Sequence, residues 1–269
     1  MATLSTKPLA AVTGASSGIG FELARQFAQN GFDLVIAAED EGIAAAARAL
    51  EALGARVDPV RVDLATYEGV EALYERIRSA ARPLEAIAIN AGVGVGGDFA
   101  RETDLQRELE LIRLNVTSTV HLTKRVVADM VARGKGRVLI TSSIAAVMPS
   151  PFEAVYGASK AFDLSFASSL REELKDTGVT VTALLPGPTD TNFFHRAGMD
   201  DTKAGTESKD ENDPADVARQ GFEALMRGDD RVVAASLKTK LEGAAARFLP
   251  ESVKAAWHRT MSEPGTAKK

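Results

Sequence analysis

The sequence predicts an α/β fold, in which helices cover both faces of a doubly wound parallel sheet of about seven strands. Short apolar runs alternate with longer stretches of helical periodicity through the first two-thirds of the chain. The runs are nearly continuous in apolar content or rich in β-branched residues, as strands covered on both faces tend to be. A glycine-rich loop follows the first run, where a strand turns into a helix.

Seven runs are expected to form strands. In chain order they are LAAVTG (9–14), DLVIAA (33–38), RVDPVRVDL (56–64), EAIAIN (85–90), GRVLITS (136–142), VTVTALLP (179–186) and RVVAAS (231–236).

Helical periodicity fills the segments between these strands. The expected helices cover 21–31, 42–54, 68–81, 105–134, 155–175, 213–228 and 240–250. Glycines at 31, 54 and 134 are typical helix stop signals, and Asp213 before Pro214 predicts a capped start. The tail SEPGTAKK (262–269) is expected to be frayed.

Composition excludes several classes of function. The chain of 269 residues is 45% hydrophobic and 26% charged, as in an ordinary globular protein. Its net charge of −5 argues against nucleic-acid binding. There are no cysteines, and the three histidines are not at ligand spacing, so no metal site is expected. No apolar run approaches the roughly 20 residues of a membrane span, and no signal peptide is recognised, so a cytoplasmic protein is expected.

The glycine-rich loop has the pattern Thr-Gly-x-x-x-Gly-x-Gly over residues 13–20. Glycines at this turn let the backbone approach a pyrophosphate, whose charge the helix N-terminus favours. A plain glycine turn is the alternative, and the position inside a strand–helix–strand unit argues against it. The residues expected to contact a dinucleotide here are Gly14, Ser16, Ser17, Gly18, Ile19 and Gly20.

The end of the second expected strand bears on the choice of dinucleotide. Ala38 and Glu39 stand there, about twenty residues beyond the glycines. A carboxylate at this point accepts hydrogen bonds from a ribose 2′-hydroxyl and repels a 2′-phosphate. No Arg or Lys is present, and the loop has Ser17 where a basic residue would help, so NAD is favoured over NADP. The alternative is that these acids only cap the following helix.

The third and fourth expected strands also end on candidate residues. Asp63, followed by Leu64, is placed to accept a hydrogen bond from an adenine amino group, or to cap the helix that starts near Thr66. After the fourth strand, small residues leave room for a cofactor. The candidates there are Asn90, Ala91 and Gly92.

Asn115 lies inside a long helical stretch, between Leu114 and Val116. Asn is a poor helix former, so this position indicates either a surface site or a functional kink. The apolar neighbours argue against a merely solvated residue.

Tyr156 and Lys160 stand four residues apart, thirteen residues after Ser143. Residues at this spacing share one face of a helix. A free phenol has a pKa near 10, and two nearby cations, the Lys160 ammonium and an oxidised nicotinamide, are expected to lower it by about 3 units. Ser143 is placed to donate a hydrogen bond to a substrate oxygen, with Ser142 lining the wall.

A surface pair on an amphipathic helix is the alternative for Tyr156 and Lys160. The apolar residues Val155, Phe162 and Phe166 suggest instead that one face of this helix is packed.

In this order and spacing, the motifs resemble those of the short-chain dehydrogenases/reductases over about residues 8–195. The matching segments are TGASSGIG, Asp63, INAG (89–92), Asn115, the Ser143–Tyr156–Lys160 set and PGPTDT (186–191). The resemblance implies a seven-stranded Rossmann fold, an NAD(P) cofactor and an oxidoreductase that acts on an alcohol or ketone.

The resemblance also implies a role for each matching residue. Tyr156 is the acid/base, Ser143 orients the substrate, Lys160 holds the nicotinamide ribose, and Asn115 opens its helix and holds a water of a proton relay. The loop after the sixth strand contacts the nicotinamide carboxamide and phosphates through Pro186, Gly187, Thr189 and Thr191.

Two positions depart from the family pattern. Ile89 stands where the family usually has Asn, which is expected to change local packing more than chemistry. At the second strand, Ala38 replaces the Asp of NAD users and Glu39 replaces the Arg of NADP users.

We expect one domain over 1–269, with a cofactor and catalytic core at 8–195, a mobile polar lid at 196–213 and substrate-side helices at 214–269. Six apolar residues are candidates to line the pocket: Ala145, Val147, Met148, Phe193, Phe194 and Met199. A surface role is expected for His195 and Arg196 in preference to binding an anionic substrate group. A homodimer or homotetramer is expected through the helices at about 101–133 and 155–175.

Two alternatives to a redox enzyme remain open. One is a catalytically silent nucleotide-binding regulator or scaffold on the same fold. The other is a non-redox isomerase or dehydratase of the same family.

Overall fold

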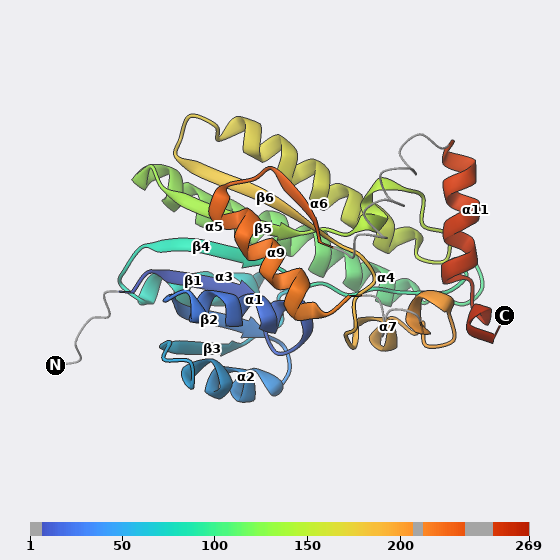
Figure 1. The fold of residues 1–269 in the computed structure, drawn as a ribbon, viewed down its shortest axis with the longest axis horizontal. Coiled ribbons are helices and arrows are strands. Elements are labelled where there is room, and N and C mark those ends of the chain that lie inside the picture. Colours follow the sequence, from blue (N-terminus) through green and yellow to red (C-terminus); the bar gives the residue numbers. More distant parts are fainter. Residues whose placement is uncertain (1–6, 207–211, 235–249, 269) are drawn as a thin grey trace.

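The computed structural model describes residues 7–206, 212–234 and 250–268. Its centre is one parallel sheet of seven strands in the order β3-β2-β1-β4-β5-β6-β7 (Figure 1). The strands are β1 (Leu9–Thr13), β2 (Asp33–Ala38), β3 (Val57–Arg61), β4 (Leu84–Ile89), β5 (Gly136–Thr141), β6 (Val179–Pro186) and β7 (Arg231–Ala234). All seven runs predicted to be strands are confirmed, and residues 235–236 of the last one lie outside the described part.

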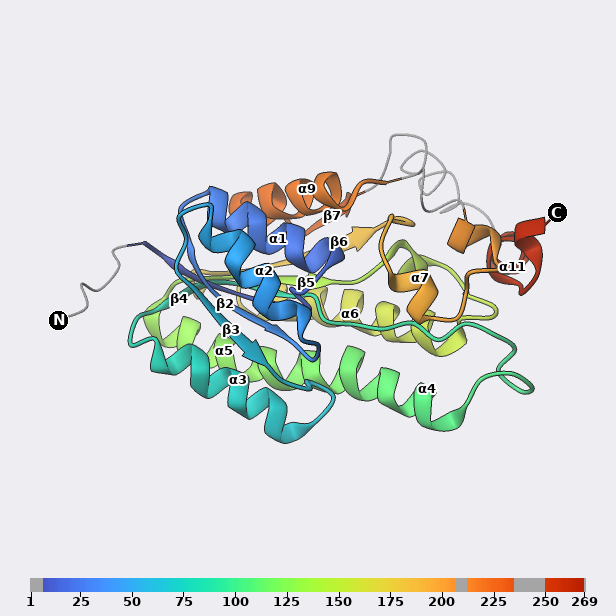
Figure 2. The ribbon, with the colours of Figure 1, turned by 90° about the horizontal axis from the view of Figure 1, so that it is seen from below.

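Helices cover both faces of the sheet (Figure 2). One face carries α1 (Gly18–Gln29), α2 (Gly42–Glu51) and α9 (Pro214–Arg227). The other carries α3 (Tyr67–Ser79), α5 (Ser118–Arg133) and α6 (Ala154–Glu173), with α4 (Leu105–Ile112) leading into α5. The doubly wound fold class is therefore confirmed.

Local side chains start several of these helices where the sequence predicted. Asp213 accepts a hydrogen bond from the backbone amide of Ala215 at 2.8 Å, and Pro214 follows it in the first turn of α9. Thr66, and not Asp63, caps α3 by accepting from the amide of Gly69 at 3.0 Å. Gly134 ends α5 with φ of 68°, a conformation that glycine adopts without a steric penalty.

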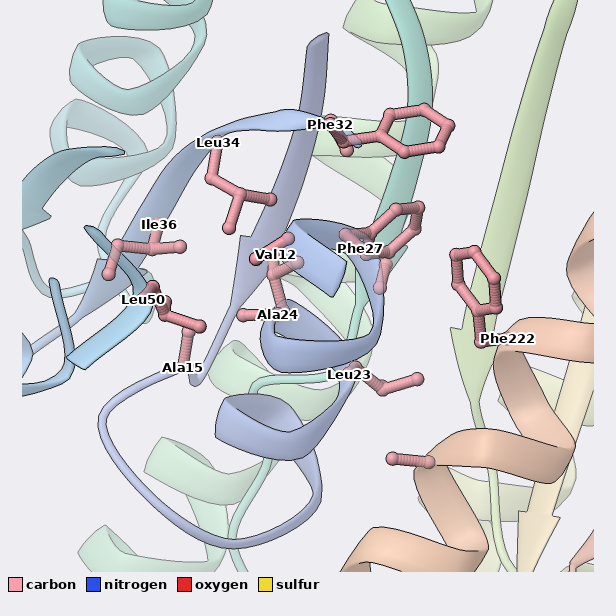
Figure 3. Packing of buried hydrophobic residues seen from close by; sticks show 14 of the residues in the cluster. Val12, Ala15, Leu23, Ala24, Phe27, Phe32, Leu34, Ile36, Leu50 and Phe222 are labelled. Atoms are coloured by element: carbon pink, nitrogen blue, oxygen red, sulfur yellow. The ribbon is translucent and has the colours of Figure 1, made fainter. Parts of the chain in front are cut away.

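The core lies in two layers because successive strand residues point to opposite faces of a sheet. Ala10 and Val12 of β1 pack under α1 and α9, whereas Leu9 and Ala11 pack against the opposite layer. In the first layer the ring of Phe27 meets the rings of Phe32 and Phe222 edge-on, at centroid distances of 5.2 Å and 5.1 Å (Figure 3).

The single helix predicted over 105–134 is interrupted. A π-helical segment, Arg113–Thr117, separates α4 from α5, and Asn115 lies in its middle with no exposed surface. Such π-bulges are frequent at functional sites. The helix thus opens where the sequence indicated a kink.

The C-terminal part differs from the sequence prediction. The helix expected at 240–250 lies almost entirely outside the described residues, and α11 (Glu251–Ser262), which the sequence did not predict, follows it. The tail is not frayed: the Gly265 amide donates to Asp201 at 2.9 Å, and Thr266 accepts from the Lys203 amide at 2.9 Å. No helix among the described residues is both long and apolar enough to cross a membrane.

Substitution of Phe27 directly tests the packing of the first core layer. Because Phe27 is fully buried, we expect Phe27→Ala to lower the free energy of unfolding by about 3 to 5 kcal/mol. Leu53→Ala, at a side chain that is 42% exposed, is expected to change it by less than about 1 kcal/mol. Urea denaturation measures both, and equal losses in the two variants would contradict this packing.

Candidate active site

One cavity runs along the edge where the strands end. It is lined by the glycine-rich loop, by residues that follow β2 to β6, by α7 (Phe193–Arg196) and by α11. Both α7 and α11 lie at the end of the molecule opposite the start of β1 (Figures 1 and 2). Parallel α/β sheets bind ligands at this edge.

The glycine-rich loop lies so close to the segment after β4 that Gly14 and Gly20 have no room for a side chain. A Cβ on Gly20 would overlap the carbonyl oxygen of Gly14, and a Cβ on Gly14 would lie 2.9 Å from the Ala91 Cα. Thr13 Oγ1 accepts hydrogen bonds from the amides of Asn90 (2.9 Å) and Ala91 (3.0 Å). This joins the ends of β1 and β4 directly beneath the loop.

The first turn of α1 is open to an anion. Ser17 occupies the N-cap position but makes no capping hydrogen bond with its side chain. Backbone amides at such a helix start bind phosphate readily. All six loop residues predicted to contact a dinucleotide line the cavity: Gly14, Ser16, Ser17, Gly18, Ile19 and Gly20.

Glu39 and Asp40, which follow β2, have different partners. Asp40 accepts from the Gly42 amide at 2.8 Å and from the Ser16 hydroxyl at 2.7 Å, so it shapes the start of α2. Glu39 lines the cavity, as does Ala38, and its carboxylate pairs with Arg196 at 2.6 Å. Capping thus accounts for Asp40 but not for Glu39.

Arg196 is not simply a surface residue, as the sequence had suggested. It lines the cavity and bridges α7 to the segment after β2, 157 positions earlier in the chain. No local pattern predicts this contact, because the two residues meet only when the sheet forms. His195 is exposed and bonds Asp200 at 2.8 Å.

The other residues predicted to contact the cofactor also reach the cavity. Asp63 accepts a hydrogen bond from the amide of Ala65 at 2.8 Å, which shapes the turn after β3. The remaining cavity-lining residues of this set are Asp63, Leu64, Asn90, Ala91, Gly92, Pro186, Gly187, Thr189 and Thr191.

Asn115 lies behind the cavity wall. Its Nδ2 donates to the carbonyl of Val93 and to the hydroxyl of Ser159, each at 3.0 Å, and its Oδ1 accepts from the Val93 amide. Ser159 in turn donates to the carbonyl of Tyr156 at 2.7 Å. Asn115 therefore links the segment after β4 to α6. Sequence reasoning did not single out Ser159.

Ser143 and Tyr156 face each other in the cavity. The Ser143 hydroxyl accepts a hydrogen bond from the Ala145 amide at 3.1 Å, and its interaction with the Tyr156 phenol lowers the pKa of that phenol. The neighbouring Ser142 instead donates to the carbonyl of Lys160 at 2.7 Å. This geometry supports the choice of Ser143 over Ser142.

Lys160 makes two buried polar contacts. Its ammonium donates to the Thr141 carbonyl at 2.9 Å and to the Asp163 carboxylate at 3.0 Å. The sequence motif includes Lys160 but not Asp163, so this ion pair was missed.

The expected lowering of the Tyr156 pKa is not produced by the protein chain itself. Burial raises the pKa of Tyr156, the hydrogen bond from Ser143 lowers it, and the charges of Glu153 and Asp163 raise it further. The expectation assigned to Lys160 an uncompensated charge, whereas its ammonium lies against the Asp163 carboxylate.

The substrate end of the cavity is mostly apolar. The ring of Phe193 lies 5.1 Å from that of Tyr156, and Phe194 packs edge-on against Phe193. Ala145 and Met148 also line the cavity. Met199 was predicted to do so but is buried against Gly96, and Val147 does not line it either.

Helix α11 adds polar groups that the sequence did not indicate. The Ser262 hydroxyl donates to the Glu153 carboxylate at 2.9 Å, and His258 Nε2 lies 3.6 Å from the same carboxylate. Burial raises the pKa of Glu153 to about 7 and lowers the pKa of His258. No motif marks this helix, which joins the site only through the tertiary fold.

The raised Glu153 pKa predicts a specific pH dependence of stability. Between pH 4.5 and about 7 the folded protein binds more protons at Glu153 than the unfolded chain, so its stability falls as pH rises. Glu153→Gln removes this titration. We expect wild type to lose roughly 3 kcal/mol of unfolding free energy relative to Glu153→Gln between acidic and mildly alkaline pH.

Urea denaturation of both proteins at several pH values measures this difference. A difference between the two proteins that stays constant across the pH range would contradict the buried position of the Glu153 carboxyl.

No group of three or more acidic or histidine side chains in the described ranges is arranged to hold a metal ion.

Comparison with known proteins gives a consistent result. Residues 8–202 match the short chain dehydrogenase family. The chain is 36% identical over 230 residues to 1-deoxy-11-beta-hydroxypentalenate dehydrogenase of Streptomyces exfoliatus, covering 82% of this chain and 80% of that protein. It is also 34% identical over 202 residues to the probable oxidoreductase EphD of Mycobacterium tuberculosis, covering 72% of this chain and only 34% of EphD.

Solved structures show the same fold. A short-chain dehydrogenase from Sphingobium yanoikuyae in complex with NADPH superposes with a TM-score of 0.78 at 30% identity, covering 88% of this chain and 93% of that one. The bulky-bulky ketone specific alcohol dehydrogenase from Comamonas testosteroni has a TM-score of 0.74 at 27% identity, covering 91% and 100%.

Proposed function

The chain belongs to the short-chain dehydrogenase/reductase family, and we propose that it transfers a hydride between a nicotinamide cofactor and an alcohol or ketone, with Tyr156 as the acid/base. The observation that carries the proposal is a single cavity that runs from the glycine-rich loop to Ser143, Tyr156 and Lys160. The match to the family and the dehydrogenase relatives support the same reaction.

The loop and the cavity suit a nicotinamide dinucleotide. The close approach of Gly20 to Gly14 and the uncapped first turn of α1 leave space and free amides for a pyrophosphate. Lys160 reaches the same cavity and would hold the nicotinamide ribose. When bound, the cofactor supplies or accepts the hydride.

The chain's own residues supply the proton and orient the substrate. In the direction of reduction, Tyr156 donates its phenolic proton to the ketone oxygen as the carbonyl carbon accepts the hydride, which gives the alcohol. Ser143 stabilises the negative charge that develops on that oxygen. After Tyr156 has donated its proton, another must reach it. We assign to Asn115 and Lys160 the role of holding a water through which this proton arrives.

NAD is the proposed cofactor, with NADP as the alternative. Glu39 lines the adenosine end of the cavity, where a carboxylate favours a 2′-hydroxyl and repels a 2′-phosphate. Its pairing with Arg196 partly neutralises this charge, which reduces the discrimination.

The proposed substrate is a mainly apolar alcohol or ketone. Aromatic and aliphatic side chains surround Tyr156, and the related enzyme from Comamonas testosteroni is described as specific for bulky ketones. In the described part of the proposed lid at 196–213, several residues are buried and anchor it to the protein, among them Ala197, Met199 and Thr202.

A homodimer or homotetramer remains our proposal for the assembly. Apolar side chains are exposed on and beside α4 and on α6, where two copies would bury them: Phe99, Leu105, Leu109, Ile112 and Phe162. A cytoplasmic location also remains a prediction.

Tyr156→Phe tests the proposed acid/base role. It removes the hydroxyl that donates the proton and keeps the ring that packs on Phe193. We expect kcat for ketone reduction to fall by at least about 100-fold while NADH affinity changes little. Consumption of NADH at 340 nm and fluorescence titration measure the two quantities.

Wild-type rates in Tyr156→Phe would exclude Tyr156 as the acid/base. Turnover of a substrate without net change in cofactor absorbance would instead support the isomerase or dehydratase alternative.

Glu39→Arg tests the cofactor proposal. It replaces a repelling carboxylate with a guanidinium and breaks the pair with Arg196. We expect the ratio of the NADP to the NAD dissociation constant to fall by about tenfold or more. Arg61→Ala, whose guanidinium bonds the backbone of Glu39 and the carboxylate of Glu41, is a nearby control. An unchanged ratio in Glu39→Arg would remove Glu39 from cofactor recognition.

A further inference from the structure

The ammonium group of Lys160 lies against a buried carboxylate outside the family motif. Lys160 Nζ and Asp163 Oδ2 are 3.0 Å apart, and their side chains are only 7% and 1% exposed. Water and salt screen such a buried pair very little. The Lys160 charge is therefore locally compensated by an opposite charge.

Asp163 has no evident role in stabilising the fold beyond this pair. Its second oxygen, Oδ1, is buried without a hydrogen-bond partner among the described residues. A buried carboxylate with an unused acceptor is unfavourable, and a well-packed apolar side chain is often more stable in such a place. Its presence beside Lys160 and one turn beyond it on α6 points to a role in the reaction.

We propose that Asp163 is a positioning residue that holds the Lys160 ammonium and offsets its charge, so that Tyr156 stays protonated at neutral pH and the site is set to reduce ketones. This inference rests on the proposed function of the same site. Of the three ammonium N–H groups, one donates to Thr141 and one to Asp163, which leaves one for the nicotinamide ribose.

The charged groups around Tyr156 determine how removal of the Asp163 charge changes the pKa of Tyr156. Glu153, at the N-cap of α6, and Asp163 on α6 both disfavour a tyrosinate, and Glu153 has His258 of α11 beside it. Lys160 is the cation on the same helix. From α7 and from the segment after β5, the neighbours are the uncharged Phe193 and Ser143.

Removing the Asp163 charge lowers the pKa of Tyr156, because the anion that opposes the Lys160 cation beside the tyrosinate is lost. Alcohol oxidation needs Tyr156 to accept the alcohol proton, so it needs the deprotonated phenol. Ketone reduction needs the protonated phenol. A raised pKa therefore suppresses oxidation at neutral pH and leaves reduction active.

Asp163→Asn tests the inference because the amide keeps the shape and an oxygen acceptor for Lys160. We expect the acid inflection of kcat for alcohol oxidation to move down by about one pH unit, with roughly tenfold faster oxidation below it. Asp33→Asn is the matched control. It removes the charge of a carboxylate that is 1% exposed and paired with Arg82 at the opposite end of β2. We expect it to leave the inflection in place.

A second measurement reads Tyr156 without turnover. The chain has three tyrosines, so labelling their Cζ carbons with ¹³C gives three signals, and Tyr156→Phe identifies the one from Tyr156. In the NAD complex, we expect the Tyr156 signal of Asp163→Asn to titrate at lower pH than that of wild type.

A Tyr156 signal and a kinetic inflection that stay at the wild-type pH, or move upward, would overturn the inference. If Asp163→Asn does not fold, Asp163→Ser replaces it, with the hydroxyl as the acceptor for Lys160. Absence of any turnover in wild type would contradict the proposed function instead, and the NMR titration would still decide the role of Asp163.

Discussion

The close contact between the first turn of α1 and the ends of β1 and β4 determines where the rest of the site lies. It exists only because Gly14 and Gly20 lack side chains, and Thr13 fixes it by bonding the backbone after β4. The same contact leaves helix amides facing the cavity. The proposed phosphate-binding turn and the junction of β1 with β4 are thus one structural feature, and a side chain at Gly14 or Gly20 would disrupt both.

A second set of hydrogen bonds connects the segment after β4 to Tyr156. Asn115 opens its helix, bonds both backbone groups of Val93 and bonds Ser159, which in turn bonds the backbone of Tyr156. The phenol is therefore positioned from the segment after β4 as well as from α6. In the same region Asp163 compensates the Lys160 charge. In the proposed reaction, Tyr156 of the motif is the acid/base, and its buried neighbours set the pH at which it works.

Sequence alone predicted what depends on local pattern. Strand and helix positions followed from apolar periodicity and caps, as at Asp213, and the loop and the Ser143–Tyr156–Lys160 set followed from spacing. It did not predict contacts between distant segments, such as Glu39 with Arg196 or Glu153 with Ser262, since no local pattern encodes them. Helix α11 was missed because the residues that it buries are polar: Lys254, His258 and Ser262. The tail was missed because its bonds go to residues 201–203.

The most direct test of the central claim is calorimetric titration of the purified protein with NAD, NADH, NADP and NADPH in turn. We expect at least one of them to bind with one molecule per chain. We also expect its affinity to fall by at least about tenfold in Gly20→Ala, where a methyl group has no room beside Gly14. Absence of binding by all four to the folded wild-type protein would contradict the central claim, and would mean that the fold has been kept without the chemistry.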